Sequence, residues 1–284
     1  MCQSKITLRK FLKLYFQVVF YGIVIGGIFV VIGNANFSVE QIVNIFLPFG
    51  HVVSDNFVNS FMVWWLTIPF LNVLVRNMTR HQHLLLILFC VVVFSLYDKT
   101  PLTEIALNPI CWFSTIYFIA SYIRLYPESI YKSESSKTWG LLSIGTVLLS
   151  VILIPFIQHC YMLTGKTNVP WGLVSDSNAP LALVVSVTTF MFFKNLKMQY
   201  CSFINIAGAT TFGVLLIHSN GILRNWLWGD KAIGCVNNYD HSWFWLYAPI
   251  AVILIFVCGA IIDYIRIRFI ERPFLHWIDI KINV

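Results

Sequence analysis

The stretch Thr211–Trp228 joins an apolar helix to side chains that could do chemistry. Its sequence, TFGVLLIHSNGILRNWLW, is apolar over Phe212–Ile217 and then places an imidazole, His218, where a membrane-buried helix approaches its end. Asn220 and Arg224 follow as candidate substrate-binding groups. An ionisable ring at the end of a span is a candidate functional group, either a proton acceptor or a group that orients a hydroxyl. The alternative is structural, a histidine that bonds a neighbouring helix or reaches the lipid headgroups.

A second candidate set is basic and lies near predicted helix ends. Side chains of this kind could bind the phosphates of a cytosolic donor through charge-assisted hydrogen bonds. Membrane topology alone also explains such a cluster, because basic residues accumulate on the cytoplasmic side. The predicted substrate-binding cations are Lys10, Lys13, Arg76 and Arg80.

Four further polar residues lie in or beside apolar runs and are interpreted as structural or site-supporting: Asn72, Arg124, Asp263 and Glu271. An amide such as Asn72 can hydrogen-bond across helices. Asp263 precedes Arg266 by three residues, a spacing that predicts an ion pair on one helix face. Glu271 lies two residues before Pro273, and we expect the helix to end there, because a residue before proline avoids the α region.

The composition identifies the class of protein. Of the 284 residues, 58% are hydrophobic and 11% are charged, and the mean hydropathy is +0.76. Soluble domains carry about 25% charged residues. Long apolar runs must be helical in a membrane, where backbone groups have no water to bond. We therefore expect an all-α membrane protein that forms a single integral-membrane domain over residues 1–284.

Apolar runs of roughly the length of a span, about 20 residues, predict about eight transmembrane helices. A shorter run, Val39–Phe49, predicts an interfacial or re-entrant helix that Pro48 stops. The eight candidate spans are Leu14–Ile32, Phe57–Val75, His83–Tyr97, Pro109–Tyr126, Thr138–Met162, Pro180–Phe193, Phe203–Ile222 and Trp245–Ile267.

The distribution of Lys and Arg orients these spans. With both termini in the cytoplasm, 15 of the 19 Lys and Arg residues fall inside and the other four outside. This is the asymmetry of the positive-inside rule. Membrane topology and contact with anionic lipid therefore explain the net charge of +7. The charge does not indicate a nucleic-acid partner.

Familiar metal and nucleophile motifs are missing from the sequence. The seven Cys residues form no close pair of the kind that binds metal or does redox chemistry. The sequence has no GxSxG, HExxH or P-loop pattern. We predict no metal and no permanently bound cofactor.

Four stretches, in order along the chain, resemble the acyltransferase-3 family of bacterial membrane O-acyltransferases, in the branch found with surface-polysaccharide genes. Their order along the chain makes the likeness specific. The stretches are FMVWWLTIPFLNVLVRNMTRHQHLLLILF, WFSTIYFIASYIRLYP, TFGVLLIHSNGILRNWLW and DYIRIRFIERPF.

The resemblance implies a multi-pass enzyme of the cell (inner) membrane. Such an enzyme transfers an acyl group, usually acetyl, from acyl-CoA to a hydroxyl of a surface polysaccharide or of its lipid-linked precursor. By the same resemblance, His218 is the histidine of the family's "YLIH" motif, with Leu215 in place of the tyrosine.

The chain departs from the family at the proposed catalytic base. The family has a basic residue, ten intervening residues and then a histidine, and this chain has no such spacing. Lys10-Phe11-Leu12-Lys13 stands where the family has Arg-x-x-Arg, and lysine lacks the planar fork of arginine. We therefore expect a chain shortened by two N-terminal helices. It would be a truncated product, an inactive remnant or one half of a larger assembly.

Three functions stay open at this point. The first is O-acyl transfer, with acyl-CoA as donor and a glycan as acceptor. The second is a catalytically inactive homologue with the same fold. The third is a glycan transporter or flippase, because intramembrane polar groups also mark substrate paths.

The charge asymmetry predicts where individual loops lie. Cysteines introduced at Thr100 and Asn168 should be labelled from outside the cell, and those at Glu134 and Leu196 only from inside, in whole cells treated with an impermeant maleimide. A reversed result at any one of these four sites would remove a span from the predicted topology.

Overall fold

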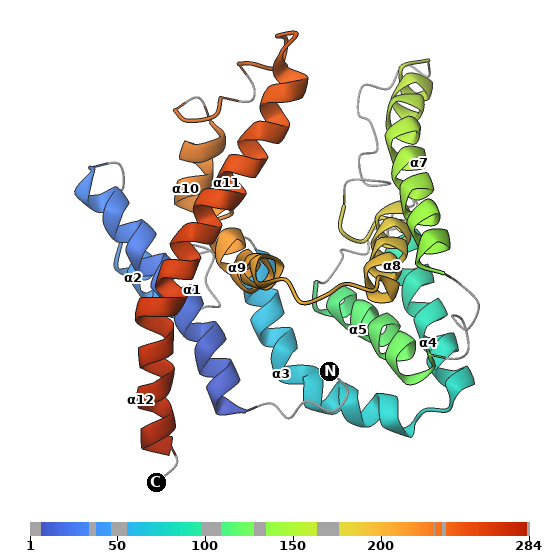
Figure 1. The fold of residues 1–284 in the computed structure, drawn as a ribbon, viewed down its shortest axis with the longest axis horizontal. Helices are drawn as coiled ribbons and strands as arrows, with labels where there is room; N and C mark the ends of the chain where they lie inside the picture. Colours follow the sequence, from blue (N-terminus) through green and yellow to red (C-terminus); the bar gives the residue numbers. More distant parts are fainter. Residues whose placement is uncertain are drawn as a thin grey trace. The chain divides into compact units, whose positions relative to one another are not determined.

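The computed structural model describes residues 7–33, 38–46, 56–97, 109–127, 135–163, 176–229, 231–234 and 237–282. These residues form helices and turns, and no strand occurs among them (Figure 1). Each of the eight predicted apolar segments contains a helix. The helices are α1 (Leu8–Val31), α2 (Val39–Phe46), α3 (Asn56–Asn77), α4 (Arg80–Val91) with the π-helical turn η1 (Val92–Leu96), α5 (Pro109–Leu125), α7 (Ser136–Leu163), α8 (Pro180–Asn195), α9 (Ser202–His218), α10 (Gly221–Trp228), α11 (Phe244–Arg266), the π-helical turn η4 (Ile267–Glu271) and α12 (Arg272–Ile282).

The described helices belong to two compact units. One comprises Thr67–Gln199, and the other combines Lys5–Leu66 with Tyr200–Val284, so that the boundary falls inside α3. The prediction of one integral-membrane domain over residues 1–284 concerns both units together and stays a prediction.

The unit formed by Lys5–Leu66 and Tyr200–Val284 has its core around α1. Buried side chains recur on α1 at Val18, Tyr21, Ile25 and Phe29, with the spacing of three and four residues that places them on one helix face. They pack against four buried apolar residues of α2, α3 and α9: Ile45, Val58, Met62 and Leu216. This face of α1 therefore organises the unit.

The Thr67–Gln199 unit is held by hydroxyl groups between α7 and α8 and by a buried imidazole between α4 and α5. Ser143 bonds Thr189 across the helix pair with 2.7 Å between their oxygens. His83 is fully buried, and its Nε2 lies 3.0 Å from the carbonyl oxygen of Phe118. Small hydroxyl residues at helix contacts are typical of membrane helices, where apolar surfaces alone do not drive association.

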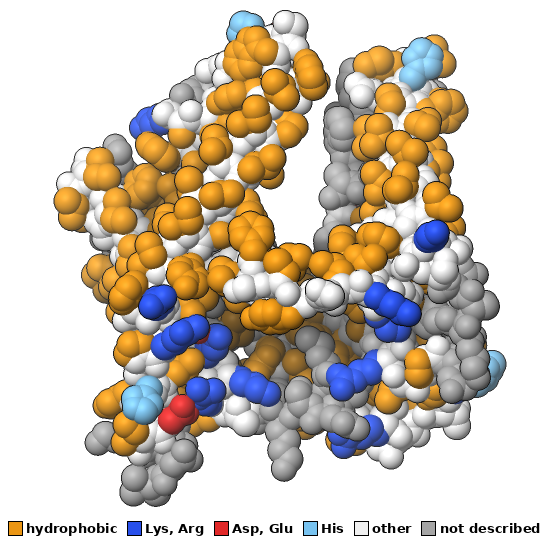
Figure 2. All heavy atoms as spheres, viewed as in Figure 1, with side chains coloured by type: hydrophobic (Ala, Val, Ile, Leu, Met, Phe, Trp, Pro, Cys, Tyr) orange, Lys and Arg blue, Asp and Glu red, His pale blue; other side chains and the backbone are white. Residues whose placement is uncertain are grey.

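The lengths and composition of the helices fit a membrane protein. Four are long and apolar enough to cross a membrane, and the bent pair α9–α10 makes five if it counts as one span. Hydrophobic side chains cover the faces of α7 and α11 seen in Figure 2. The number of eight spans and the cytoplasmic location of both termini stay predictions. The four helices are Leu8–Val31, Phe57–Asn77, Ser136–Cys160 and Phe244–Ile280.

The short segment Val39–Phe49 forms α2 as far as it is described, over Val39–Phe46. Its predicted stop at Pro48 lies outside the described residues. With eight residues, α2 is too short to span a bilayer, as the sequence indicates.

Two helix ends differ from the sequence prediction. The predicted span Phe203–Ile222 is broken, because α9 ends at His218 and α10 leaves it at 84°. The helix does not end before Pro273 either, since it continues through η4 into α12. Proline removes one backbone N–H from a helix, and Pro273 closely follows the π-helical turn, where the regular α-helical ladder is already interrupted.

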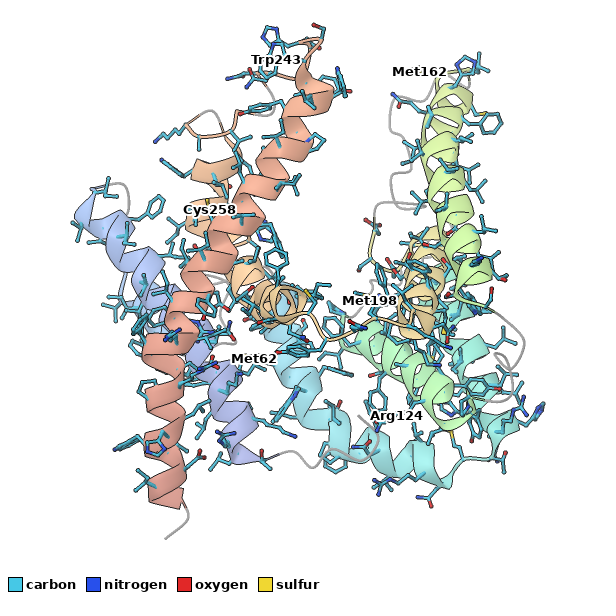
Figure 3. All side chains as sticks on the ribbon, in the orientation of Figure 1. Met62, Arg124, Met162, Met198, Trp243 and Cys258 are labelled. Atoms are coloured by element: carbon cyan, nitrogen blue, oxygen red, sulfur yellow. The ribbon has the colours of Figure 1, made fainter. Side chains whose placement is uncertain are left out.

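The core packing generates a stability prediction. Met62 is 1% exposed in the α1 core, and Met162 at the end of α7 is 63% exposed (Figure 3). Met62→Ala should cost about 2–5 kcal/mol, because it leaves a cavity among buried side chains. Met162→Ala, the matched control, should change stability by less than about 0.5 kcal/mol. Thermal denaturation of the purified protein in detergent measures both, and equal shifts would contradict the assigned core.

Candidate functional site

The centre of the candidate site is a buried arginine between two carboxylates. Arg266 is 2% exposed. Its Nε lies 2.7 Å from Oδ1 of Asp263, and its Nη1 lies 2.8 Å from Oε2 of Glu271. Both carboxylates are buried as well. The ion pair that the spacing of Asp263 and Arg266 predicts is therefore present, and Glu271 completes it from the other side.

Helix α1 faces this centre with a stripe of polar side chains spaced four residues apart. Arg9 bonds Asp279 at 2.7 Å and Lys13 bonds Glu271 at 2.9 Å. The hydroxyl of Tyr21 donates to Oδ1 of Asp263 at 2.8 Å. Successive α1 residues thus meet partners that run backwards along α12, η4 and α11, so α1 packs antiparallel to them. We call this row of contacts the polar seam.

Gln17 occupies the middle of the polar seam. Its amide has two alternative orientations: in one, Nε2 donates to Oδ1 of Asp263 at 3.3 Å, and in the other, the oxygen takes that position and accepts from Nη2 of Arg266 at 3.1 Å and from the backbone N–H of Gly213 at 3.3 Å. With its oxygen turned toward the two donors, the amide satisfies both. Gln17 therefore connects α1, α9 and α11 at one point.

The π-helical turn η4 brings Glu271 onto the face of Arg266. In a regular α-helix, a residue eight positions after Asp263 lies about 80° around the helix from it. A π-helical turn absorbs one extra residue, which brings the offset back to about −20°. Because η4 covers Ile267–Glu271, the Glu271 carboxylate reaches Arg266 rather than lipid.

Helix α9 approaches the same centre through a glycine. A Cβ added at Gly213 would overlap the carboxylate of Asp263. Only glycine leaves room there for the carboxylate against the backbone of α9. The close approach of α9 and α11 at the polar seam therefore depends on Gly213.

A pocket of about 400 Å³ opens beside the polar seam, between α1, α3 and α9. Lys10, Lys13 and Gln17 contribute its polar lining, and Phe61, Trp65 and Phe212 contribute aromatic walls. Two ammonium groups beside aromatic rings can hold an anion that is attached to an apolar or planar group. We call this the Lys10–Lys13 pocket.

His218 lines a second, smaller cavity between α9, α10 and α11. Its Nδ1 lies 2.7 Å from the carbonyl oxygen of Val214, so Nδ1 carries the proton and donates it. The neutral ring then keeps an unprotonated Nε2 that can accept a proton or a hydrogen bond. The cavity measures about 180 Å³, and Trp228, Val252 and Phe256 are among its walls.

The two candidates that follow His218 differ in their surroundings. Asn220 is buried, and its side-chain oxygen accepts from the backbone N–H groups of Ile222 and Leu223. It is thus the N-cap of α10 and helps to create the break after α9. Arg224 is exposed on α10. The predicted substrate-binding role of both residues stays a prediction.

The other candidates belong to the Thr67–Gln199 unit, whereas the polar seam belongs to the unit that contains α1. The side-chain oxygen of Asn72 accepts from the hydroxyl of Tyr117 at 2.5 Å, a bond between α3 and α5. The Nε of Arg80 donates to the hydroxyl of Tyr122 at 3.3 Å. Arg76 and Arg124 are exposed at the C-terminal ends of α3 and α5, where a cation is favourable for the helix dipole; Arg124 is labelled in Figure 3.

Sequence reasoning overlooked Gln17, Tyr21 and Gly213. A signal was available for the first two, since Arg9, Lys13, Gln17 and Tyr21 follow one another at intervals of four and so share a helix face. Gly213 gives no such signal, because its role depends on the helix that crosses it.

No family model, curated protein or solved structure matches this chain in comparisons with known proteins.

The close approach at Gly213 generates a second stability prediction. Gly213→Ala should destabilise the protein by about 1–3 kcal/mol, because the added methyl group displaces a buried carboxylate. Gly208→Ala on the same helix is the matched control, since a Cβ there meets nothing within 4 Å. It should be neutral or stabilise by up to about 1 kcal/mol. Thermal denaturation in detergent compares the two, and equal effects would contradict the contact between Gly213 and Asp263.

Proposed function

We propose that this chain is a membrane O-acyltransferase-like protein of the inner membrane. Its donor is acyl-CoA, with acetyl as the expected acyl group. Its acceptor is a hydroxyl of a cell-surface polysaccharide or of the lipid-linked precursor. The observation that carries the proposal is the Lys10–Lys13 pocket. It has a volume of about 400 Å³ and is lined by two lysines and an aromatic wall.

The chemistry of this pocket suits the donor. CoA carries phosphates beside a planar adenine, and the pocket offers ammonium groups beside the rings of Phe61, Trp65 and Phe212. Its size lies within the range of about 300–1,000 Å³ of ligand pockets. Lys13 also bonds Glu271, so a phosphate there would share an ammonium group that the polar seam already orients.

His218 suits a role on the acceptor. With Nδ1 bonded to Val214, Nε2 is available to accept the proton of a sugar hydroxyl. The freed oxygen would attack the thioester carbonyl, and the CoA thiolate would leave and take up the proton. A general base of this kind contributes roughly 10²–10⁴-fold.

The two pockets lie at different heights and on different faces of α9. His218 is six residues beyond Phe212, which corresponds to about 9 Å of helix rise and about 120° around the helix. The acyl arm of CoA would have to pass α9 to reach His218. We therefore assign His218 to orienting the acceptor, and we expect this chain to bind CoA while transferring little acyl group by itself.

A transporter is the second candidate, and the buried charges Asp263, Arg266 and Glu271 favour it. Ionisable groups inside a membrane span mark ion and substrate paths in many transporters. Glycan uptake into vesicles in the absence of any acyl donor would support transport and contradict the acyltransferase proposal.

The donor site is tested by CoA binding at several salt concentrations. Lys10→Gln should weaken CoA affinity severalfold, and the loss should shrink as salt rises, because screening weakens charge attraction. Adding Lys13→Gln should weaken it further, because both ammonium groups line the pocket. Lys197→Gln, an exposed lysine outside the pocket, is the control and should leave the affinity unchanged.

One result would contradict the proposed donor site, and a second would change the role assigned to His218. The first is CoA affinity that stays the same when both Lys10 and Lys13 are neutralised, which would leave membrane topology as the reason for these charges. The second is strong O-acetylation by the purified chain that disappears in His218→Ala. That outcome would make His218 the catalytic base and overturn its assignment as an orienting group.

A further inference from the structure

A third cavity lies between α9 and α11 and shares no residue with the Lys10–Lys13 pocket. It measures about 380 Å³. Ala207 on α9 and Ala260 on α11 contribute only methyl groups, and the larger side chains around them leave a groove. Those larger side chains include Phe203, Phe256, Ile261 and Tyr264. All of these residues belong to the unit that contains α1.

The surroundings of this groove are apolar and open. Phe203 is 78% exposed and Ile261 is 56% exposed. In a helix of a membrane protein such side chains face lipid. The groove is therefore accessible to molecules that are dissolved in the bilayer.

One end of the groove carries a cation. Tyr264 lines the groove, and its hydroxyl accepts from Nη1 of Arg268, one turn further along, at 3.4 Å. Arg268 is exposed, and Tyr264 is its only hydrogen-bond partner in the part of the chain that the structure describes. A guanidinium has five N–H donors, so most of them stay available to an anion.

We propose that this groove is a binding site for one phospholipid molecule. Its acyl chain lies over Ala207 and Ala260, and its phosphate is bound by Arg268 and the hydroxyl of Tyr264. This occupant matches the two features that occur together here, an apolar groove and an arginine at its end. A second copy of the chain is a poorer match, because a stable dimer buries about 800 Å² on each partner, far more than the groove offers. The inference does not depend on the acyltransferase proposal.

Native mass spectrometry of the detergent-purified protein tests the site, with phosphatidylglycerol, phosphatidylcholine or diacylglycerol added at equal concentration. We expect one tightly retained molecule of either phospholipid and no retained diacylglycerol, which has the chains without the phosphate. Arg268→Gln should lower phospholipid retention about tenfold, as expected when a charge-assisted hydrogen bond is lost. Ala260→Leu should lower it to a similar extent, because the larger side chain fills the groove.

Two variants control for general effects. Lys197→Gln removes an exposed positive charge elsewhere, and Ala120→Leu enlarges an exposed alanine on α5. Neither should change lipid retention. If Ala260→Leu does not yield folded protein, Arg268→Gln still tests the phosphate contact, since its side chain is exposed and outside the core.

Three outcomes would overturn the proposal. Equal phospholipid retention by the groove variants and the controls would mean that only nonspecific boundary lipid is present. Retention of diacylglycerol as strong as that of the phospholipids would exclude a phosphate site. A dimer that Ala260→Leu dissociates would assign the groove to a second copy of the chain.

Discussion

The arrangement of α1, α9 and α11 depends on the burial of one guanidinium, that of Arg266. A charge removed from water costs several kcal/mol unless partners surround it. Asp263 and Glu271 neutralise Arg266 on two sides, and the Tyr21 ring lies 5.8 Å from its guanidinium carbon. Removing either carboxylate would leave the buried guanidinium with one ionic partner instead of two. All three charges lie on the continuous segment α11–η4, so α1 and α9 must stay packed over this segment to keep the charges buried.

Several local irregularities of the chain serve this cluster. The π-helical turn η4 rotates Glu271 onto the face of Arg266. Gly213 lets the Asp263 carboxylate lie against α9. Each irregularity costs some stability on its own, since π-helical turns are rare and glycine weakens helices. Without η4 and Gly213, the buried charges would lose their partners, and an unpaired charge in a membrane interior costs more than either irregularity.

The polar seam also fixes the positions of the candidate binding sites. Lys13 and Gln17 take part in the seam and line the Lys10–Lys13 pocket at the same time. Helix α9 presents Phe212 to that pocket, its C-terminal His218 to the second cavity and Ala207 to the lipid groove. A ligand in the Lys10–Lys13 pocket would thus contact the seam directly, through the amide and ammonium groups that orient the buried carboxylates.

The sequence by itself determined the class of protein and the positions of its helices. Long apolar runs such as Leu14–Ile32 can only be helical in a membrane, and the structure has helices in all eight such segments. The pairing of Asp263 with Arg266 was also predictable, because both lie on one helix and their spacing is local. The spacing of Lys13, Gln17 and Tyr21 also predicts that they share one helix face. It does not predict which residues of other helices they contact.

Only the tertiary structure decided which distant groups meet. The break after His218 depends on Asn220 capping a new helix, and the passage of the helix through Pro273 depends on a π-helical turn that Arg266 helps to hold. The end of the helix at Pro273 was wrongly predicted, whereas the sequence did indicate that a helix approaches its end at His218 and gave no sign of the bend that follows. The union of Lys13, Gln17, Gly213 and Asp263 joins residues up to about 250 positions apart. Periodicity specifies the face on which a side chain lies, whereas its partner is specified by packing. The cost of burying charge favours a packing in which Arg266 is paired with Asp263 and Glu271.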